Sequence, residues 1–325
     1  MTDKICGLGV IGCGTFCDAY LRNLGPVYRN VRPVGCADLN TEAAQAAAAR
    51  WNIPKVYTTA EMLADPAVEM VYIAAPNSLH YDYAMAALEA GRHVLCEKPF
   101  VPTLAQADAL YRLAKERGLL LLETITTAYH PNYARARAEL SQIGDVMGVS
   151  CVFCQRSSRY PALLAGQVSP VFSPAFCGGA LMDINLYNIH FVVGLFGEPQ
   201  AVHYHPHLHE NGIDTNGVLV LEYPGFLCTC TGAKDSAGGN AAEIRGSRGR
   251  IEVRPGSSNC QELEVLCGGD SRRIVEDGSP WKYEVLGLER IVAEKDFDAC
   301  DQAFTVTRSV VKVLEAARKD AGLSY

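Results

Sequence analysis

Residues 5–24, ICGLGVIGCGTFCDAYLRNL, contain the pattern that decides the fold. An apolar run ends at Gly12, a second glycine follows at Gly14, and a helical stretch begins a few residues later. In a strand–turn–helix unit the first glycine permits the tight turn, the second lets a pyrophosphate approach the backbone, and the helix N-terminus faces the phosphates. The third fingerprint position holds Cys17, which departs from the usual Gly or Ala but is small enough for close packing. The pattern predicts a dinucleotide-binding unit.

Asp38 is expected to determine whether the protein prefers NAD or NADP. It follows a second apolar strand, 31–37, and its next neighbours are Leu39 and Asn40 rather than an arginine. A carboxylate at this distance from the glycine turn bonds the ribose hydroxyls and repels a 2′-phosphate. The sequence therefore predicts NAD rather than NADP.

The pattern of alternating strands and helices continues to about residue 124. Further strands are expected at 68–74, 93–96 and 119–122, and helices at 42–50, 81–90 and 104–118. Counting the last of these strands as the sixth, the pattern predicts a doubly wound parallel Rossmann sheet over residues 1–124. Residues 125–325 are then a second, α+β domain, with strands at 149–155, 218–223, 226–231, 242–245 and 250–253. A late helix at about 304–317 is expected to return to the first domain.

Two loops at strand ends carry candidate ligand-binding groups. Glu97, Lys98 and Pro99 follow the strand at 93–96, and proline fixes the backbone beside the lysine. Pro76, Asn77 and His80 follow the strand before it. Taken singly, Lys98 is compatible with a surface lysine, and Asn77 and His80 with caps of the following helix. Beside a glycine turn they favour a cofactor site, because strand C-termini are where ligands bind in such sheets.

A third group lies on the apolar helix expected from Gly179 to Leu195. Asp183, Tyr187 and His190 recur at i, i+4 and i+7, which places them on one helix face. They are either satisfied core groups or polar groups that face a wet cavity.

Together these motifs resemble the Gfo/Idh/MocA oxidoreductases, and the resemblance spans nearly the whole chain. It is carried by the Gly12/Gly14 turn, Pro76-Asn77 with His80, Glu97-Lys98-Pro99 and Gly178-Gly179-Ala180-Leu181-Met182-Asp183. The resemblance implies that Lys98 binds the reacting hydroxyl beside the nicotinamide. It also implies that the second domain is an open, mostly antiparallel sheet that carries a small-molecule sugar or polyol substrate and mediates homo-oligomerisation. In the family, the aspartate is followed four residues later by His or Tyr, and here that residue is Tyr187.

The predicted reaction moves a hydride between NAD and a secondary alcohol or ketone. Tyr187 is the expected general acid/base, Lys98 its electrostatic helper and Asp183 the orienting group. The expected cofactor contacts are Gly12, Gly14, Thr15, Phe16, Asp38, Pro76, Asn77, His80, Glu97 and Lys98. His190, Tyr160 and Arg156 are candidate substrate contacts. Two other functions stay open: a redox-neutral, NAD-assisted glycosidase and a non-catalytic nucleotide-binding sensor.

The amino-acid composition restricts the kinds of binding partner and the cellular compartment that we expect. The formal net charge of −7 over 325 residues argues against nucleic acid or an anionic membrane. Thirteen cysteines without disulfide spacing suit a reducing cytoplasm, and Cys151 and Cys154 are expected to be core residues. No signal peptide is expected before the first strand, and no apolar run is expected to reach membrane-spanning length. The histidines of 203–209 alternate along a strand, but Pro206 indicates an edge or bulge, and no metal site is predicted.

Overall fold

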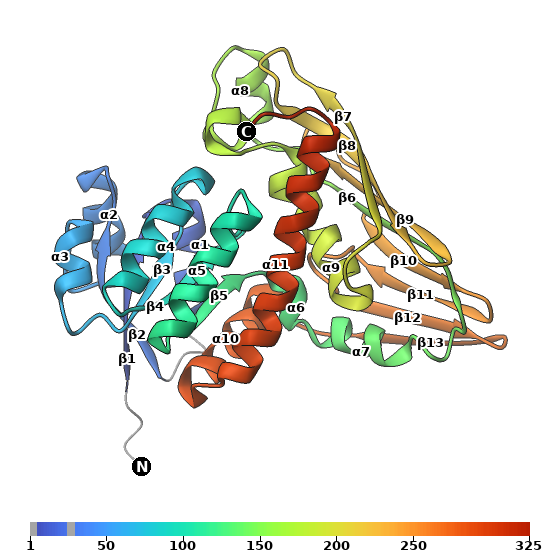
Figure 1. The fold of residues 1–325 in the computed structure, drawn as a ribbon, viewed down its shortest axis with the longest axis horizontal. Coiled ribbons are helices and arrows are strands. Elements are labelled where there is room, and N and C mark those ends of the chain that lie inside the picture. The colour runs from blue at the N-terminus through green and yellow to red at the C-terminus, as the bar shows by residue number, and fades with distance from the viewer. Residues whose placement is uncertain (1–4, 25–29) are drawn as a thin grey trace. The chain divides into compact units, whose positions relative to one another are not determined.

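A computed structural model describes residues 5–24 and 30–325 of the chain (Figure 1). The N-terminal residues 1–4, where the absence of a signal peptide was expected, lie outside this part. The chain divides into two compact units. Unit 1 comprises Met1–Thr124 and Glu284–Arg308, and unit 2 comprises Ile125–Tyr283 and Ser309–Tyr325. The helix predicted at 304–317 is the second half of α11 (Phe297–Asp320), and the division falls within it, after Arg308.

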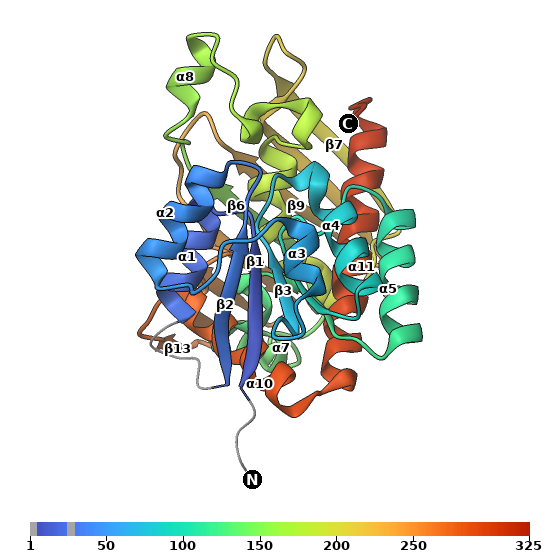
Figure 2. The ribbon, with the colours of Figure 1, turned by 90° about the vertical axis from the view of Figure 1, so that its left-hand side faces the viewer.

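Unit 1 is built on a parallel sheet of five strands. The strands are β1 (Cys6–Ile11), β2 (Val31–Ala37), β3 (Met70–Ile73), β4 (His93–Glu97) and β5 (Leu121–Thr124). Their order is β2-β1-β3-β4-β5, and Figure 2 shows β2, β1 and β3 side by side. All residues of β3 and β5 are buried, which is the pattern of a parallel sheet covered on both faces. The predicted Rossmann-type sheet is therefore confirmed.

The predicted number of strands is wrong by one. The strand expected as the sixth, at 119–122, is β5, the fifth strand of the sheet. Between β2 and β3, the described residues pair with the sheet through a single isolated bridge, from Cys36 to Val56. One bridge does not make a strand, because a ladder needs consecutive pairs.

The helices of unit 1 are α1 (Thr15–Leu24), α2 (Thr41–Trp51), α3 (Thr59–Ala64), α4 (His80–Glu89), α5 (Leu104–Arg117), most of α10 (Pro280–Glu294) and the first half of α11. Helices α2, α3 and α5 of unit 1 begin at residues whose side chains cap the helix N-terminus. Asn40 accepts hydrogen bonds from Glu42 and Ala43 at the start of α2. Gly118 takes the left-handed conformation that ends α5.

Unit 2 is built on an eight-stranded sheet. Its strands are β6 (Val146–Cys154), β7 (Ala201–Leu208), β8 (Asp214–Tyr223), β9 (Phe226–Ala233), β10 (Ala241–Gly246), β11 (Gly249–Arg254), β12 (Glu262–Cys267) and β13 (Asp270–Val275). Their order is β13-β12-β11-β10-β6-β9-β8-β7, and every pair is antiparallel except β6 with β9. The mostly antiparallel sheet implied by the family resemblance is confirmed. Pro206 lies in β7 at the sheet edge, as its missing N–H predicts.

A long apolar helix packs on one face of this sheet. It starts with a π-helical turn, Leu181–Asn185, and continues as α9 (Leu186–Phe196) until Gly197 ends it. The side chains of Asn185 and Asn188 donate to the backbone carbonyls of Cys230 and Thr231 in β9. These two hydrogen bonds hold the helix against β9.

The expectation that no apolar run reaches membrane-spanning length is wrong. Pro174–Phe196 has 23 residues and a mean hydropathy of 1.2, so length and composition alone would allow a span. In the structure 72% of its apolar window is buried, and α9 packs on β6 and β9. The segment is apolar because it is the core helix of unit 2.

Unit 2 also contains short helices around this core. They are α6 (Thr126–Tyr129), α7 (Pro131–Glu139), α8 (Tyr160–Leu164) and two single 3₁₀ turns at Pro170–Phe172 and Pro174–Phe176. Phe172 forms a buried apolar cluster with Leu163 and Ile213. This cluster lies against the start of the apolar helix, since Gly179 donates to the carbonyl of Val171.

Candidate active site

The glycine turn has the geometry that its sequence predicts. Gly12 has φ +90°, and a Cβ there would lie 2.6 Å from the carbonyl carbon of Ala74. Gly14 differs, because a Cβ built on it would meet nothing within 4 Å. Gly12 is therefore required by the fold, while Gly14 leaves open space beside the backbone at the start of α1. Cys17, at the third fingerprint position, is fully buried.

Replacing Gly12 by alanine should destabilise unit 1 and weaken nucleotide binding. The substitution combines a positive φ with a clash against fixed backbone, so we expect a loss of at least about 2 kcal/mol. Gly91→Ala is the matched control, because Gly91 has φ +73° and nothing within 4 Å of a built Cβ. Calorimetric melting of both variants measures the difference. Equal melting temperatures would show that the close approach of Gly12 to Ala74 costs nothing.

Asp38 lies at the glycine turn, as its place after β2 predicts. Its carboxylate accepts hydrogen bonds from the backbone N–H groups of Cys13 and Asn40, both at 2.8 Å. The bond from Cys13 holds the Asp38 side chain against the glycine turn, and the bond from Asn40 holds it at the N-terminus of α2. The carboxylate is therefore fixed at the C-terminal edge of β1 and β2.

His80 joins the two loops that follow β3 and β4. Its ring is fully buried, with Nδ1 2.9 Å from the carbonyl oxygen of Pro99 and Nε2 2.9 Å from that of Ala75. Burial lowers the pKa of His80, and the backbone carbonyls partly oppose that shift. These contacts of His80 position the Lys98–Pro99 turn, and a contact between His80 and the cofactor stays a prediction. Pro76 and Asn77 lie in the same loop, where Asn77–Leu79 forms one 3₁₀ turn.

Lys98 is buried at the end of β4, with 6% of its surface exposed. Its Nζ lies 4.8 Å from the ring centroid of Phe16, at the start of α1, so the lysine and the glycine turn share one region of unit 1. Thr15 is the first residue of the same helix. A lysine this deeply buried is unusual for a surface role. The structure excludes the simple surface lysine that the isolated Lys-Pro pair allowed.

Unit 1 buries the carboxyl groups of Glu97, Glu123 and Glu284, and the charge of Lys98 acts on Glu97 and Glu284. Glu97 accepts a 2.6 Å hydrogen bond from Tyr72, and Glu123 accepts from the backbone of Phe100 at 3.1 Å. Burial raises the pKa of Glu97, and the bond from Tyr72 and the charge of Lys98 partly oppose this. Burial raises the pKa of Glu284 well above its usual range, and Glu97 and Glu123 add to the rise. Sequence reasoning missed Glu123 and Glu284, which lie far from the motif in the chain.

Asp183 forms an ion pair with Lys234, a residue that sequence reasoning also missed. The Lys234 ammonium donates to the Asp183 carboxylate, and their side chains are 5% and 18% exposed. Lys234 follows β9 directly, and its Nζ lies 5.5 Å from the ring centroid of Phe172. Lys234 belongs to no recognisable sequence motif, since it reaches Asp183 only in the folded protein.

The structure separates the three polar residues of the apolar helix. Asp183 and Tyr187 are the half-buried residues between Ala180 and Val193, whereas His190 is 2% exposed. The Tyr187 ring contacts Phe153 of β6 edge-on, with centroids 5.7 Å apart. The spacing thus places Asp183 and Tyr187 on the open side of the helix and His190 in its interior.

The two remaining substrate candidates lie after β6. Arg156 is exposed, and its guanidinium lies 5.8 Å from the ring centroid of Tyr160. Tyr160 is half-buried and packs against Phe172. Their roles toward a substrate stay predictions.

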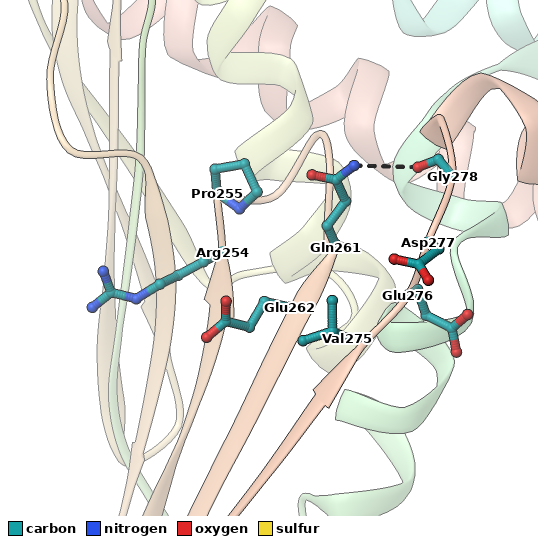
Figure 3. Close-up of a pocket in the computed structure, with 8 residues that line it drawn as sticks. All are labelled: Arg254, Pro255, Gln261, Glu262, Val275, Glu276, Asp277 and Gly278. Atoms are coloured by element: carbon teal, nitrogen blue, oxygen red, sulfur yellow. Dashed lines mark hydrogen bonds between the residues drawn. The ribbon is translucent and has the colours of Figure 1, made fainter.

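A surface pocket of about 340 Å³ lies elsewhere in unit 2 (Figure 3). It is lined by Arg254, Pro255, Gln261, Glu262, Val275, Glu276, Asp277 and Gly278. Glu276 is paired with Arg135, and Glu262 binds Arg273 through two hydrogen bonds of 2.5 and 2.6 Å. None of the predicted site residues lines this pocket, and ion pairs account for two of its three carboxylates.

No metal centre is assembled by the residues that the structure describes. Along β7, His203, His205 and His207 are exposed, and His203 lies 3.5 Å from both Glu222 and Asp320. Cys151 is fully buried in β6, which agrees with the expected core role, whereas Cys154 at the end of the same strand is only half-buried.

Comparison with known protein families identifies the class to which this fold and site belong. Residues 6–125 match the oxidoreductase family with an NAD-binding Rossmann fold, and residues 132–252 match the C-terminal domain of the same family. The chain belongs to the Gfo/Idh/MocA oxidoreductases.

Individual relatives resemble the chain along nearly its whole length. It is 30% identical to scyllo-inositol 2-dehydrogenase (NADP(+)) of Bacillus subtilis, over 97% of each chain. It is 32% identical to trans-1,2-dihydrobenzene-1,2-diol dehydrogenase of Xenopus laevis, over 94% of each. A levoglucosan dehydrogenase solved with NADH and levoglucosan has the same fold, with a TM-score of 0.84, 21% identity and coverage of 99% and 98%.

Proposed function

We propose that the protein is an NAD-dependent dehydrogenase or reductase of a secondary alcohol or ketone in a sugar, cyclitol or related polyol. The observation that carries the proposal is the buried Lys98, held at the end of β4 beside the glycine turn. The names of the relatives point to the same class, since they describe enzymes of an inositol, a dihydrodiol and an anhydrosugar.

Three side chains carry the proposed reaction. Tyr187 takes the proton from the reacting hydroxyl, and Lys98 donates a hydrogen bond to the alkoxide oxygen as charge develops. The ordinary pKa of tyrosine is near 10, so a phenolate needs a cation to stabilise it, and we assign that role to Lys98. Asp183 accepts a hydrogen bond from a second hydroxyl and orients the substrate. NAD, when bound, supplies the nicotinamide that accepts the hydride leaving carbon.

The described residues fit this cofactor. Gly14 leaves open space at the N-terminus of α1, where a pyrophosphate is favoured. Asp38 is fixed at the turn as an acceptor for ribose hydroxyls. A carboxylate in that place repels the extra phosphate of NADP, so we favour NAD although the inositol dehydrogenase is named for NADP(+).

NAD should bind at least about tenfold more tightly than NADP, a difference of roughly 1.4 kcal/mol. The reason is repulsion between the Asp38 carboxylate and the 2′-phosphate. Calorimetric titration of the protein with each nucleotide measures the two dissociation constants. Comparable dissociation constants for NAD and NADP would show that Asp38 does not discriminate between them.

A screen of polyols and aldoses with NAD, followed by NADH absorbance, tests the activity directly. The proposal predicts net NADH formation with at least one of them. The glycosidase alternative predicts product without net NADH, and the sensor alternative predicts binding without turnover.

The compartment and the assembly are part of the proposal. The thirteen cysteines are in the reduced thiol form, which suits a reducing cytoplasm. Association into a homo-oligomer through the sheet of unit 2 is what the family resemblance implies.

A further inference from the structure

The Lys234 ammonium has more donors than the protein uses. An ammonium group carries three N–H donors and no acceptor. Among the described residues, its one oxygen partner is the Asp183 carboxylate, and its other neighbour is the ring face of Phe172. At 5% exposure, bulk water has little access to the remaining donor capacity. A buried ammonium with unused donors is costly unless another oxygen reaches it.

The backbone of Lys234 is held by hydrogen bonds to two neighbouring segments of the chain. Its backbone N–H donates to Thr215 and its carbonyl accepts from Ser157, both at 2.8 Å. The next residue, Asp235, accepts from the Thr215 hydroxyl at 2.9 Å. A lysine held in this way presents its ammonium at a defined place beside Asp183.

We propose that Lys234 is a specificity-determining residue that binds, together with Asp183, a hydroxyl group adjacent to the reacting carbon. A hydroxyl can accept from the Lys234 ammonium and donate to the Asp183 carboxylate at the same time, and a C–H group can do neither. The preferred substrates are therefore vicinal diols. This inference rests on the proposed function for the role of Asp183, but it concerns binding and not hydride transfer.

A matched pair of small alcohols tests the inference. Trans-1,2-cyclohexanediol and cyclohexanol differ by one hydroxyl, and a site built to bond a hydroxyl rejects the analogue that lacks it. We expect the NADH-loaded wild type to bind the diol at least about tenfold more tightly by calorimetry. In Lys234→Gln the preference should fall to about threefold or less, since the cation is lost. Lys312→Gln, which removes an exposed lysine paired with Glu198, should keep the wild-type preference.

Each result decides one claim. A wild type without preference for the diol, or a Lys234→Gln protein that keeps the full preference, overturns the inference. Because NADH-loaded protein carries out no oxidation, a Lys234-dependent preference in a protein that never reduces NAD would contradict the proposed function alone. Circular dichroism monitors folding. If Lys234→Gln does not fold, Lys234→Arg keeps the charge but displaces its donors, and it must lower the preference.

Discussion

Lys98→Met should lower kcat about 100- to 1,000-fold, far more than it weakens NAD binding. Methionine keeps the length and apolar bulk of the side chain but removes the cation, so the variant separates charge from packing. An interaction made only in the transition state affects kcat much more than ground-state binding. Single-turnover hydride transfer and calorimetric titration with NAD measure the two quantities.

Lys115→Met provides the control for this experiment. Lys115 belongs to the same unit and pairs with Asp301, but its side chain is 45% exposed. Surface pairs of this kind contribute little, so kcat should not change. An unchanged hydride-transfer rate in folded Lys98→Met would mean that the buried lysine is not catalytic.

Tyr187→Phe should lower kcat by about 100- to 10,000-fold, the range typical of a lost general acid or base. The ring and its edge-on contact with Phe153 are retained, so the fold should not change. Steady-state turnover with the substrate found in the polyol screen measures the loss.

Tyr223→Phe is the matched control in unit 2. The Tyr223 hydroxyl donates to the carbonyl of Gly197 at 2.8 Å, so the variant should lose about 1 kcal/mol of stability and no activity. Near-full turnover by Tyr187→Phe would remove the tyrosine from the mechanism.

The elements of unit 1 could be predicted because the sequence motifs that specify them are short and continuous in the chain. The turn at Gly12 and the carboxylate of Asp38 each follow an apolar strand, and parallel strands end at one edge of a sheet. The same reasoning placed Lys98 at a strand end. The strand count failed because the strand expected as the sixth is β5, the fifth strand of the sheet.

The partners of these residues could not be predicted, since they come from distant parts of the chain. Lys234 stands between Ala233 and Asp235 in a stretch that gives no sign of burial. Glu284 looks like an ordinary helical glutamate, yet it is 1% exposed. β12 and β13 were missed because both carry several charged residues, Glu262 and Glu264 in β12 and Arg272 and Arg273 in β13, and their pairing identifies them as strands.

Unit 1 is assembled from two segments that are far apart in the chain, and this restricts when it can fold during synthesis. Thr307 donates to the buried carboxylate of Glu123 at 2.8 Å, and the Cys300 thiol bonds the backbone of Leu121. These partners are synthesised after the whole of unit 2 up to Tyr283 has emerged. Domains otherwise tend to fold from the N-terminus during synthesis, whereas unit 1 cannot be completed until residues 284–308 have been made. A nascent chain that stops before residue 284 lacks the groups that bond Glu123 and Leu121.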